Sequence, residues 1–291
     1  MGFTLEKDIP DLKDKVILVT GGNSGLGYET VRHLAQHNPA HIYLAARSVD
    51  KGNAAIKQIQ ESTPNACPIS LLTLDLSSFG SIKAAARTFR ERETRLDILV
   101  NNAGIMMFGT NHLGHALLTN LLLPVLEATT KLSPDVRVVT VSSATELRAP
   151  EDVYNFEQLK TTCPDLHTTT RYGISKLANL HYSSALARHY EASGIKFICT
   201  HPGAANTNLH RDSNGFFLRL FLHAAIPFLP SAETGALNQI WATVSPDARN
   251  GGLYAPVGKP WSTSKNGQNA ELGEELFSWT QKELRQHLGK S

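Results

Sequence analysis

Short apolar runs alternate with longer amphipathic stretches along most of the chain. The first apolar run, Lys15–Thr20, ends in glycines, and the stretch after it, Gly25–His37, has the spacing of a helix with one apolar face. Further strands are predicted over His41–Ala46, Ile69–Leu74, Asp97–Val100 and Asp135–Ser142, and further helices over Lys51–Ser62, Ser78–Glu91 and His112–Ala128. Strands that are apolar on both faces and alternate with helices are typical of a parallel sheet covered on each side.

The second half of the chain continues this alternation less regularly, after a long polar connection that follows Ser143. Helices are predicted over Thr170–Glu191 and Ala232–Val244, strands over Lys196–Thr200 and Gly252–Ala255, and an irregular segment over Pro202–Pro230. The 291 residues contain no repeat of solenoid period and no low-complexity linker. We therefore predict one doubly wound, Rossmann-type α/β domain of three layers over residues 1–291.

Charge and cysteine content exclude several classes of function. The 28 Lys and Arg and 26 Asp and Glu are spread without a basic block, so we expect no nucleic-acid partner. The cysteines, Cys67, Cys163 and Cys199, lie far apart, which predicts no metal site and a reducing compartment, the cytoplasm. The apolar stretch Phe216–Pro230 is interrupted by charge and proline and falls short of the roughly 20 apolar residues of a spanning helix, so we expect no transmembrane segment.

A glycine-rich turn stands between the first strand and the first helix. Glycines at this place let the backbone turn sharply and come close to a pyrophosphate, which then lies at the helix N-terminus. The alternative is a tight turn without a ligand, but its position after the first strand favours a dinucleotide site. The predicted cofactor-binding residues of the turn are Gly21, Asn23, Ser24, Gly25, Leu26 and Gly27.

The end of the second strand indicates which dinucleotide is bound. The strand ends in Arg47 and Ser48, with no carboxylate before Asp50. An acidic residue here would bind the ribose hydroxyls of NAD, whereas a guanidinium pairs with the 2′-phosphate of NADP. Arg47 therefore favours NADP(H), although a solvated arginine at a strand end is the alternative.

Tyr172 and Lys176 lie four residues apart on a predicted helix, and hence on one face of it. A free phenol has a pKa of about 10, and a nearby ammonium favours the phenolate and brings the pKa towards neutrality. The pair can therefore act as a proton-transferring centre. Alone, a Tyr and a Lys four residues apart are more often an ordinary helix surface than a catalytic pair.

Taken together, these motifs resemble the short-chain dehydrogenase/reductase family. The resemblance rests on Thr20–Gly27, Asn101-Asn102-Ala103-Gly104, Ser142-Ser143, Tyr172–Lys176, and Pro202-Gly203 with Thr207, all in the family's order. The C-terminal stretches Glu233–Ala236 and Gly251–Pro256 are similar to the branch that contains retinol-dehydrogenase-like and fungal secondary-metabolism reductases. The family implies hydride transfer between a nicotinamide and a carbonyl or alcohol.

The resemblance also implies roles for individual residues. Tyr172 transfers the proton, Lys176 lowers the pKa of Tyr172 and holds the nicotinamide ribose, and Ser143 orients the substrate oxygen in preference to Ser142. Asp75 with Leu76 faces the adenine. The remaining cofactor contacts that the resemblance implies are Asn102, Ala103, Gly104, Pro202, Gly203, Ala205 and Thr207.

Asn111 matches a fourth catalytic residue of the family, whose backbone helps to hold a water in a proton relay. The sequence departs from the family here, because only the six residues Ile105–Thr110 separate it from Gly104. A helix with Thr110 as its N-cap places Asn111 in the first turn. Two interpretations stay open: a shortened variant with a more open site, or a damaged gene product with impaired activity.

The expected function is an NADP(H)-dependent alcohol dehydrogenase or ketoreductase for a small to medium lipophilic molecule. An apolar segment, Phe216–Leu222, stands where the family has its substrate-covering segment, with peripheral membrane contact as the alternative. Cys163 and His201 are expected to take no part in catalysis. Family habit implies a homodimer or homotetramer. The alternatives are an epimerase or dehydratase of the extended branch and a catalytically silent NADP-binding scaffold or sensor.

Overall fold

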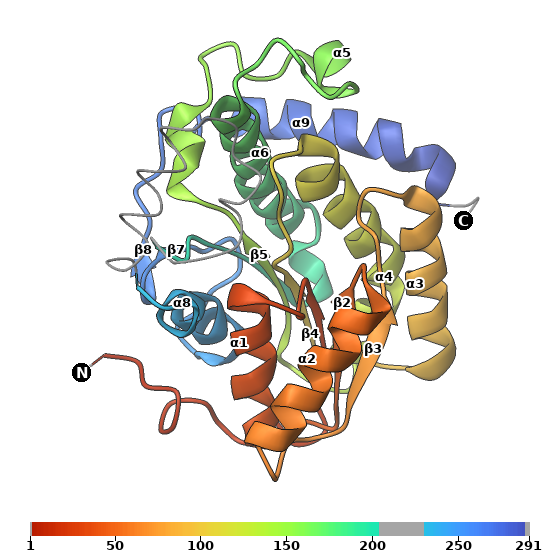
Figure 1. The fold of residues 1–291 in the computed structure, drawn as a ribbon. Coiled ribbons are helices and arrows are strands. Elements are labelled where there is room, and N and C mark those ends of the chain that lie inside the picture. The colour runs from red at the N-terminus through yellow and green to blue at the C-terminus, as the bar shows by residue number, and fades with distance from the viewer. Residues whose placement is uncertain (1, 204–229, 289–291) are drawn as a thin grey trace, which may run out of the picture.

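A single sheet with helices on both faces forms the centre of the molecule (Figure 1). The structure, a computed structural model, describes residues 2–203 and 230–288. The strands follow the order β3-β2-β1-β4-β5-β6-β7-β8, and all neighbours are parallel except β7 and β8. Their bounds are β1 Val16–Thr20, β2 His41–Ala46, β3 Ile69–Thr73, β4 Ile98–Asn101, β5 Val136–Val141, β6 Ile195–Thr200, β7 Leu253–Ala255 and β8 Lys259–Pro260. The predicted doubly wound α/β fold is confirmed.

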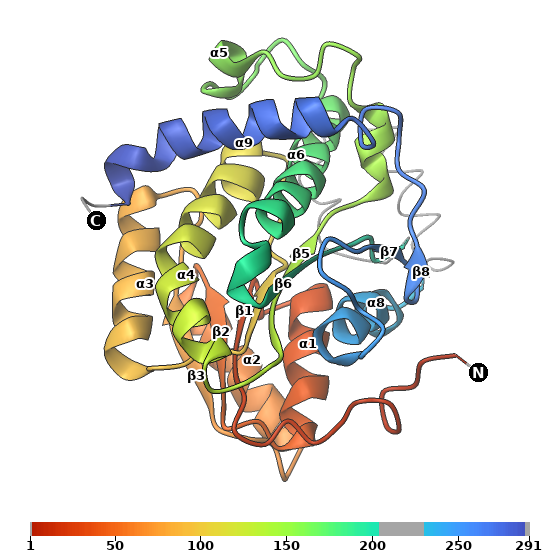
Figure 2. The same ribbon diagram turned by 180° about the vertical axis from the view of Figure 1, so that it is seen from behind.

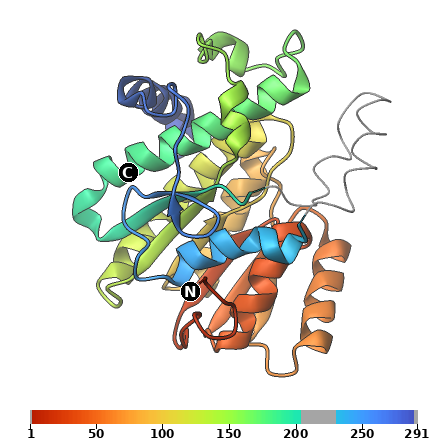
Figure 3. The ribbon, with the colours of Figure 1, turned by 90° about the vertical axis from the view of Figure 1, so that its left-hand side faces the viewer.

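The helices form one layer on each face of the sheet (Figure 3). One layer holds α1 (Gly25–Leu34), α2 (Val49–Ser62) and α8 (Ala232–Val244), and the other holds α3 (Phe79–Arg92), α4 (His115–Thr130) and α6 (Thr168–His189). A further helix, α9 (Ala270–Leu284), lies across the outside of the second layer and packs on α6 (Figure 2). The α6 helix is thus covered on both sides, and nearly every residue from Gly173 to Ala187 is buried.

The alternating direction of side chains along each strand explains how two cores form, one on each face of the sheet. In β1, Ile17 and Val19 pack on the side of α1 and α8, whereas Val16 and Leu18 pack on the side of α3 and α4. Successive side chains of a strand point to opposite faces, so a strand apolar at every position must be covered twice. The full burial of β1 follows from this requirement.

The order of the strands reverses between β1 and β4, since β1 is followed outward by β2 and β4 by β5. Crossovers leave such a point in opposite directions, which opens a crevice at the carboxyl ends of the strands. The turns after β1, β4, β5 and β6 meet at this edge. They carry the glycine-rich turn, Asn102–Gly104, Ser143 and Pro202-Gly203.

Most predicted elements agree with the structure, and β2 and α8 agree at both ends. The predicted helix over His112–Ala128 corresponds to α4, but α4 begins three residues later, at His115, and ends two residues later, at Thr130. A π-helix, Gly109–Gly114, precedes α4, and Phe108, not Thr110, stands at its N-terminus. The helical backbone therefore begins before Thr110. Thr110 lies inside the π-helix and cannot cap it.

Several elements were not predicted from the sequence. They are α9, β8, a short helix α5 (Phe156–Leu159) and a 3₁₀-helix η3 (Ala144–Arg148). The predicted cofactor contacts Ala205 and Thr207 and the apolar segment Phe216–Leu222 lie outside the described residues. Within residues 2–203 and 230–288, no helix has the length and apolar character needed to cross a membrane.

Candidate active site

The glycine-rich turn after β1 needs glycine for two separate reasons. Gly21 and Gly25 have φ of 66° and 55°, in the left-handed region that side chains disfavour. Gly27 has an ordinary φ, but a Cβ there would collide with the carbonyl group of Gly21. The amides of Gly21 and Gly22 both donate to the carbonyl of Ala45, at 2.8 and 3.2 Å, which fixes the turn to β2.

The N-terminus of α1 faces this edge, and among residues 2–203 and 230–288 no side chain accepts a hydrogen bond from its first amide groups. Ser24 is the N-cap residue, but its exposed side chain accepts no hydrogen bond from the helix, and the first turn contains no acidic residue. Unsatisfied N–H groups and the helix dipole together favour an anion at this place. The turn and the helix therefore fit the pyrophosphate of a dinucleotide.

Asn102 supports the turn from behind. Its amide Nδ2 donates to the carbonyl of Thr20 at 2.8 Å, and its Oδ1 accepts from Gln239 of α8 at 3.2 Å. The side chain is thereby committed to the protein interior. Ala103 and Gly104, which follow it, are half-buried at the edge of the crevice.

Arg47 and Asp75 lie on the other side of the turn. Arg47 is exposed, and its charge contributes to a lowered pKa of Asp75, although hydrogen bonds from Ser77 contribute more. The Asp75 carboxylate accepts from the amide and the hydroxyl of Ser77, at 2.9 and 2.7 Å. Leu76 is buried, and Ser48 accepts from the amide of Lys51 as the N-cap of α2.

Ser143, Tyr172 and Lys176 meet at the carboxyl end of β5. The Nζ of Lys176 lies 5.5 Å from the centre of the Tyr172 ring and donates to the carbonyl of Val141 at 2.9 Å. Ser142 and Ser143 face opposite ways: Ser142 is buried and donates to the carbonyl of Lys176 at 2.6 Å, whereas Ser143 is half-buried and hydrogen-bonds Tyr172. Ser143 and Tyr172 are thus both half-buried at this edge, whereas Ser142 is turned into the interior.

Asn111 lies in the π-helix and clamps the shortened loop. Its Oδ1 accepts from the amide of Ile105 at 2.8 Å, and its Nδ2 donates to the carbonyl of Ile105 at 2.5 Å and to the hydroxyl of Ser175 at 2.9 Å. Gly104 lies between the clamp and Lys176, because a Cβ there would lie 3.5 Å from the Nζ of Lys176 and 3.7 Å from the Oδ1 of Asn111.

Comparison with known proteins agrees with this arrangement. The family described as short chain dehydrogenase matches residues 15–150. The short-chain dehydrogenase/reductase drtF of Aspergillus calidoustus is 37% identical over 95% of this chain and 96% of its own length. Retinol dehydrogenase 12 of Mus musculus is 34% identical over 91% of this chain and 84% of its own length.

The chain belongs to the short-chain dehydrogenase/reductase family. It is accordingly an enzyme of the oxidoreductase class. Among solved structures, the NADPH-bound carbonyl reductase from chicken fatty liver shares the fold, with a TM-score of 0.66 and 20% identity over 86% of this chain and 100% of that one.

Burial dominates the electrostatics of this short-chain dehydrogenase/reductase site. It raises the pKa of Tyr172 above its ordinary value, and the hydrogen bond with Ser143 acts in the opposite direction. It lowers the pKa of Lys176 to about 8. The raised pKa of Tyr172 runs against the expectation that Lys176 brings it towards neutrality, because burial disfavours the charged phenolate.

The carbonyl of Asn111, which the family resemblance assigns to a relay water, accepts hydrogen bonds from two buried side chains. The Nδ1 of His115 lies 2.9 Å from it, and the amide of Asn179, in the orientation that satisfies its partners, donates to it at 3.0 Å. The sequence offered one signal for His115, since it stands four residues after Asn111 and so on the same helix face.

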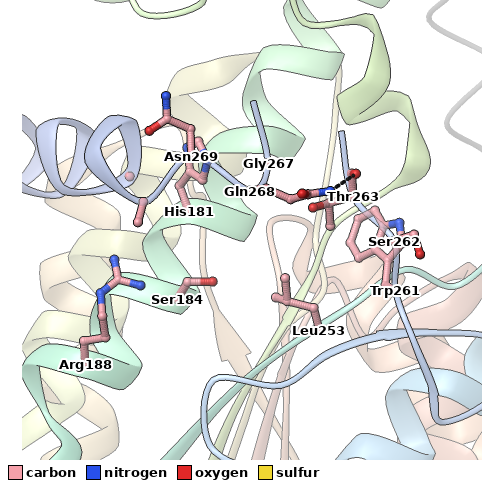
Figure 4. A pocket seen from close by; sticks show the side chains of 12 residues that line it. His181, Ser184, Arg188, Leu253, Trp261, Ser262, Thr263, Gly267, Gln268 and Asn269 are labelled. Carbon is pink, nitrogen blue, oxygen red and sulfur yellow. Dashed lines mark hydrogen bonds between the residues drawn. The ribbon is translucent and has the colours of Figure 1, made fainter. Parts of the chain in front are cut away.

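Two other places on the molecule could suggest a ligand. A cavity of about 400 Å³ lies between α6, β7 and the segment before α9, lined by Arg188, His181 and Trp261 among others (Figure 4). Its charged group, Arg188, pairs with Glu274. Glu29, His33 and Glu233 have their ligand atoms within 4.8 Å of one another, but the guanidinium of Arg32 lies 2.7 Å from both carboxylates and supplies the positive charge.

Proposed function

We propose that this protein is an NADP(H)-dependent oxidoreductase that interconverts a carbonyl and an alcohol on a small to medium lipophilic substrate. One observation carries the proposal: the hydroxyls of Tyr172 and Ser143 stand beside Lys176 at the strand edge that also holds the glycine-rich turn. A proton donor and a dinucleotide site at one crevice are the two requirements of hydride transfer to a carbonyl.

NADPH, when bound, supplies the hydride. The N-terminus of α1 and the turn Gly21–Gly27 would hold its pyrophosphate, and the exposed guanidinium of Arg47 would pair with the 2′-phosphate. Lys176 would hold the nicotinamide ribose. The NADPH-bound chicken carbonyl reductase supports the choice of cofactor by its shared fold. Asp75, Leu76, Asn102, Ala103, Gly104, Pro202, Gly203, Ala205 and Thr207 complete the proposed cofactor set.

The raised pKa of Tyr172 suits the reductive direction. A phenol that stays protonated at neutral pH can donate its proton to the carbonyl oxygen as hydride adds to the carbonyl carbon. The product is an alcohol, and the phenolate left on Tyr172 lies beside the ammonium of Lys176. Ser143 orients the substrate oxygen, and Asn111 contributes by fixing Ile105 and Ser175.

The lipophilic substrate is proposed from the family resemblance and from the apolar side chains of the shortened loop that follows Gly104. Met107 is half-buried, and Phe108, in the shortened loop, packs with Leu159 and Ile174 of the segment around α5 and α6. The three cysteines are free, which supports a reducing, cytoplasmic compartment. A role in secondary metabolism and a homodimeric or homotetrameric state stay predictions from the family resemblance.

The test follows nicotinamide absorbance with NADPH and a panel of lipophilic ketones and aldehydes. We expect wild-type turnover, and a loss of kcat of about 10²- to 10⁴-fold in Tyr172→Phe, because the proton donor is removed. Tyr182→Phe is the matched control, since Tyr182 lies on the same helix and bonds only Asn120 and Gln281 in the described structure. Binding of NADPH without turnover on any substrate would contradict the proposal and favour a silent NADP-binding protein.

A further inference from the structure

A buried hydrogen-bond chain runs from the glycine-rich turn to Asn111 through one histidine. His115, the first residue of α4, is 3% exposed. Its Nδ1 lies 2.9 Å from the carbonyl oxygen of Asn111, and its Nε2 lies 2.9 Å from the hydroxyl of Thr20. Thr20 is the last residue of β1, so the imidazole connects the sheet edge with the π-helix.

The direction of each hydrogen bond in this chain is determined. A carbonyl can only accept, so the Nδ1 of His115 carries the proton. Burial and the nearby charge of Lys176 lower the pKa of His115 to about 4, so the ring is neutral and its Nε2 carries no proton. Thr20 must then donate to Nε2 and not to the carbonyl of Val100, which lies at 3.3 Å. If Thr20 donated to Val100 instead, the buried Nε2 would be left without a donor, and Nε2 could itself donate to Thr20 only as a doubly protonated, buried imidazolium.

Both ends of the chain reach groups of the active site. The Thr20 oxygen accepts from the amides of Asn102 and Ala103, each at 3.0 Å, and so holds the turn after β4. At the other end, Asn111 holds Ser175 of α6, the neighbour of Lys176 in sequence. His115 donates from Nδ1 and accepts at Nε2, and it therefore connects the two halves of the crevice.

We propose that His115 is a positioning residue that fixes the cofactor-binding turns through Thr20 and the catalytic helix through Asn111. The inference rests on the proposed function and deepens it. His115 touches no reacting atom. Its two ring nitrogens bond different parts of the site, so each hydrogen bond can be removed by its own substitution. Each substitution is expected to change a different kinetic constant.

Two substitutions separate the nitrogens. In His115→Asn, the amide replaces the Nδ1 donor to Asn111 but is too short to reach Thr20. In His115→Gln, the amide replaces the Nε2 group towards Thr20 but removes the Nδ1 donor, which leaves the carbonyl of Asn111 with Asn179 as its side-chain donor. We expect His115→Asn to raise the Kd for NADPH about tenfold with kcat at saturating NADPH nearly unchanged, and His115→Gln to lower kcat about tenfold with Kd nearly unchanged.

The matched control is His112→Gln. His112 is also buried in the π-helix, but its Nε2 bonds Thr280 of α9 and no residue of the site. A loss of stability common to any buried histidine appears in all three variants, as a lowered Tm. The split between Kd and kcat appears only if His115 positions both sides. Equal changes of Kd and kcat in His115→Asn and His115→Gln, or no change in folded variants, overturn the proposal.

A second measurement needs no activity. ¹⁵N spectra of histidine-labelled protein report which ring nitrogen is protonated, and we expect His115 to be neutral with its proton on Nδ1 down to about pH 5. A proton on Nε2 overturns the inference. An inactive wild type that binds NADPH contradicts the proposed function alone, because the Kd of His115→Asn and the tautomer still decide the role of His115.

Discussion

The two sides of the crevice are built on different principles. On the cofactor side, short turns join regular strands to regular helices, and backbone contacts, such as those of the amides of Gly21 and Gly22 with Ala45, are joined by local side-chain contacts of Thr20 and Asn102. On the substrate side, long irregular segments are held by side chains. Buried Glu146 accepts from the amide of Ser264 at 2.8 Å and also from its hydroxyl, which ties η3 to the C-terminal segment.

This difference indicates which parts of the site depend on neighbouring residues in the sequence and which depend on distant ones. Backbone-built turns depend on local residue types, chiefly glycine, and tolerate little change. Side-chain ties such as that of Glu146 depend on partners more than a hundred residues away, so they can be replaced without changing the fold. The predictions below test whether the cofactor side is the less tolerant one.

The largest effect is expected from Gly27→Ala. Because the added Cβ meets the backbone of Gly21, the turn must open, and we expect loss of NADPH binding by about a hundredfold or more together with a lowered Tm. Fluorescence titration with NADPH measures it. Gly80→Ala is the control, since Gly80 lies outside the turn and its Cβ would make only an ordinary contact, 3.7 Å from the hydroxyl oxygen of Ser78. Equal losses in the two variants would show that close approach is not the reason for Gly27.

The same contrast explains which parts could be predicted from the sequence. β2, α8 and the glycine-rich turn follow from local patterns of apolar residues and glycine, and they were found. The sequence also contains a signal for α9, because Asn269 can cap a helix and apolar residues follow it at helical spacing, at Leu272, Leu276 and Leu284. The helix was nevertheless not predicted.

Other features have no local signal. The π-helix over Gly109–Gly114 depends on where the short loop is clamped by Asn111 and on the close packing of Gly114 against the carbonyl of Leu76, both of which are tertiary contacts. The raised pKa of Tyr172 depends on burial that spacing alone cannot show. Sequence spacing identified the pair with Lys176 but gave the wrong direction for the pKa shift.

Lys176 lies where the cofactor side meets the substrate side, so Lys176→Met is expected to change both turnover and stability. We expect turnover to fall about a hundredfold or more, while the free energy of unfolding rises by about 2 to 3 kcal/mol, because a buried charge is removed. The pKa of Lys176 is about 8 in the folded protein, below its ordinary 10.5, so burying the charged form costs stability.

The pH dependence gives the control. Below pH 8 the lysine is charged in both folded and unfolded chains and the cost is complete, whereas above 10.5 it is neutral in both and the cost is absent. The stability advantage of Lys176→Met should therefore be largest below pH 8 and shrink as the pH rises towards 10.5. Denaturant unfolding at several pH values measures it. An advantage that does not change with pH would mean that the methionine stabilises by packing alone.

The smallest effect is expected on the substrate side, from Cys163→Ala. Cys163 is 2% exposed and its thiol donates to the carbonyl of Gln158. Burial raises the pKa of this thiol, so the reactive thiolate is disfavoured at neutral pH. We expect kcat and KM to stay within about twofold and the free energy of unfolding to fall by about 1 kcal/mol, through the lost sulfur contacts. Steady-state kinetics and denaturant unfolding check both. A large fall in kcat with unchanged stability would give Cys163 a part in the reaction, and would show that the substrate side is as intolerant of change as the cofactor side.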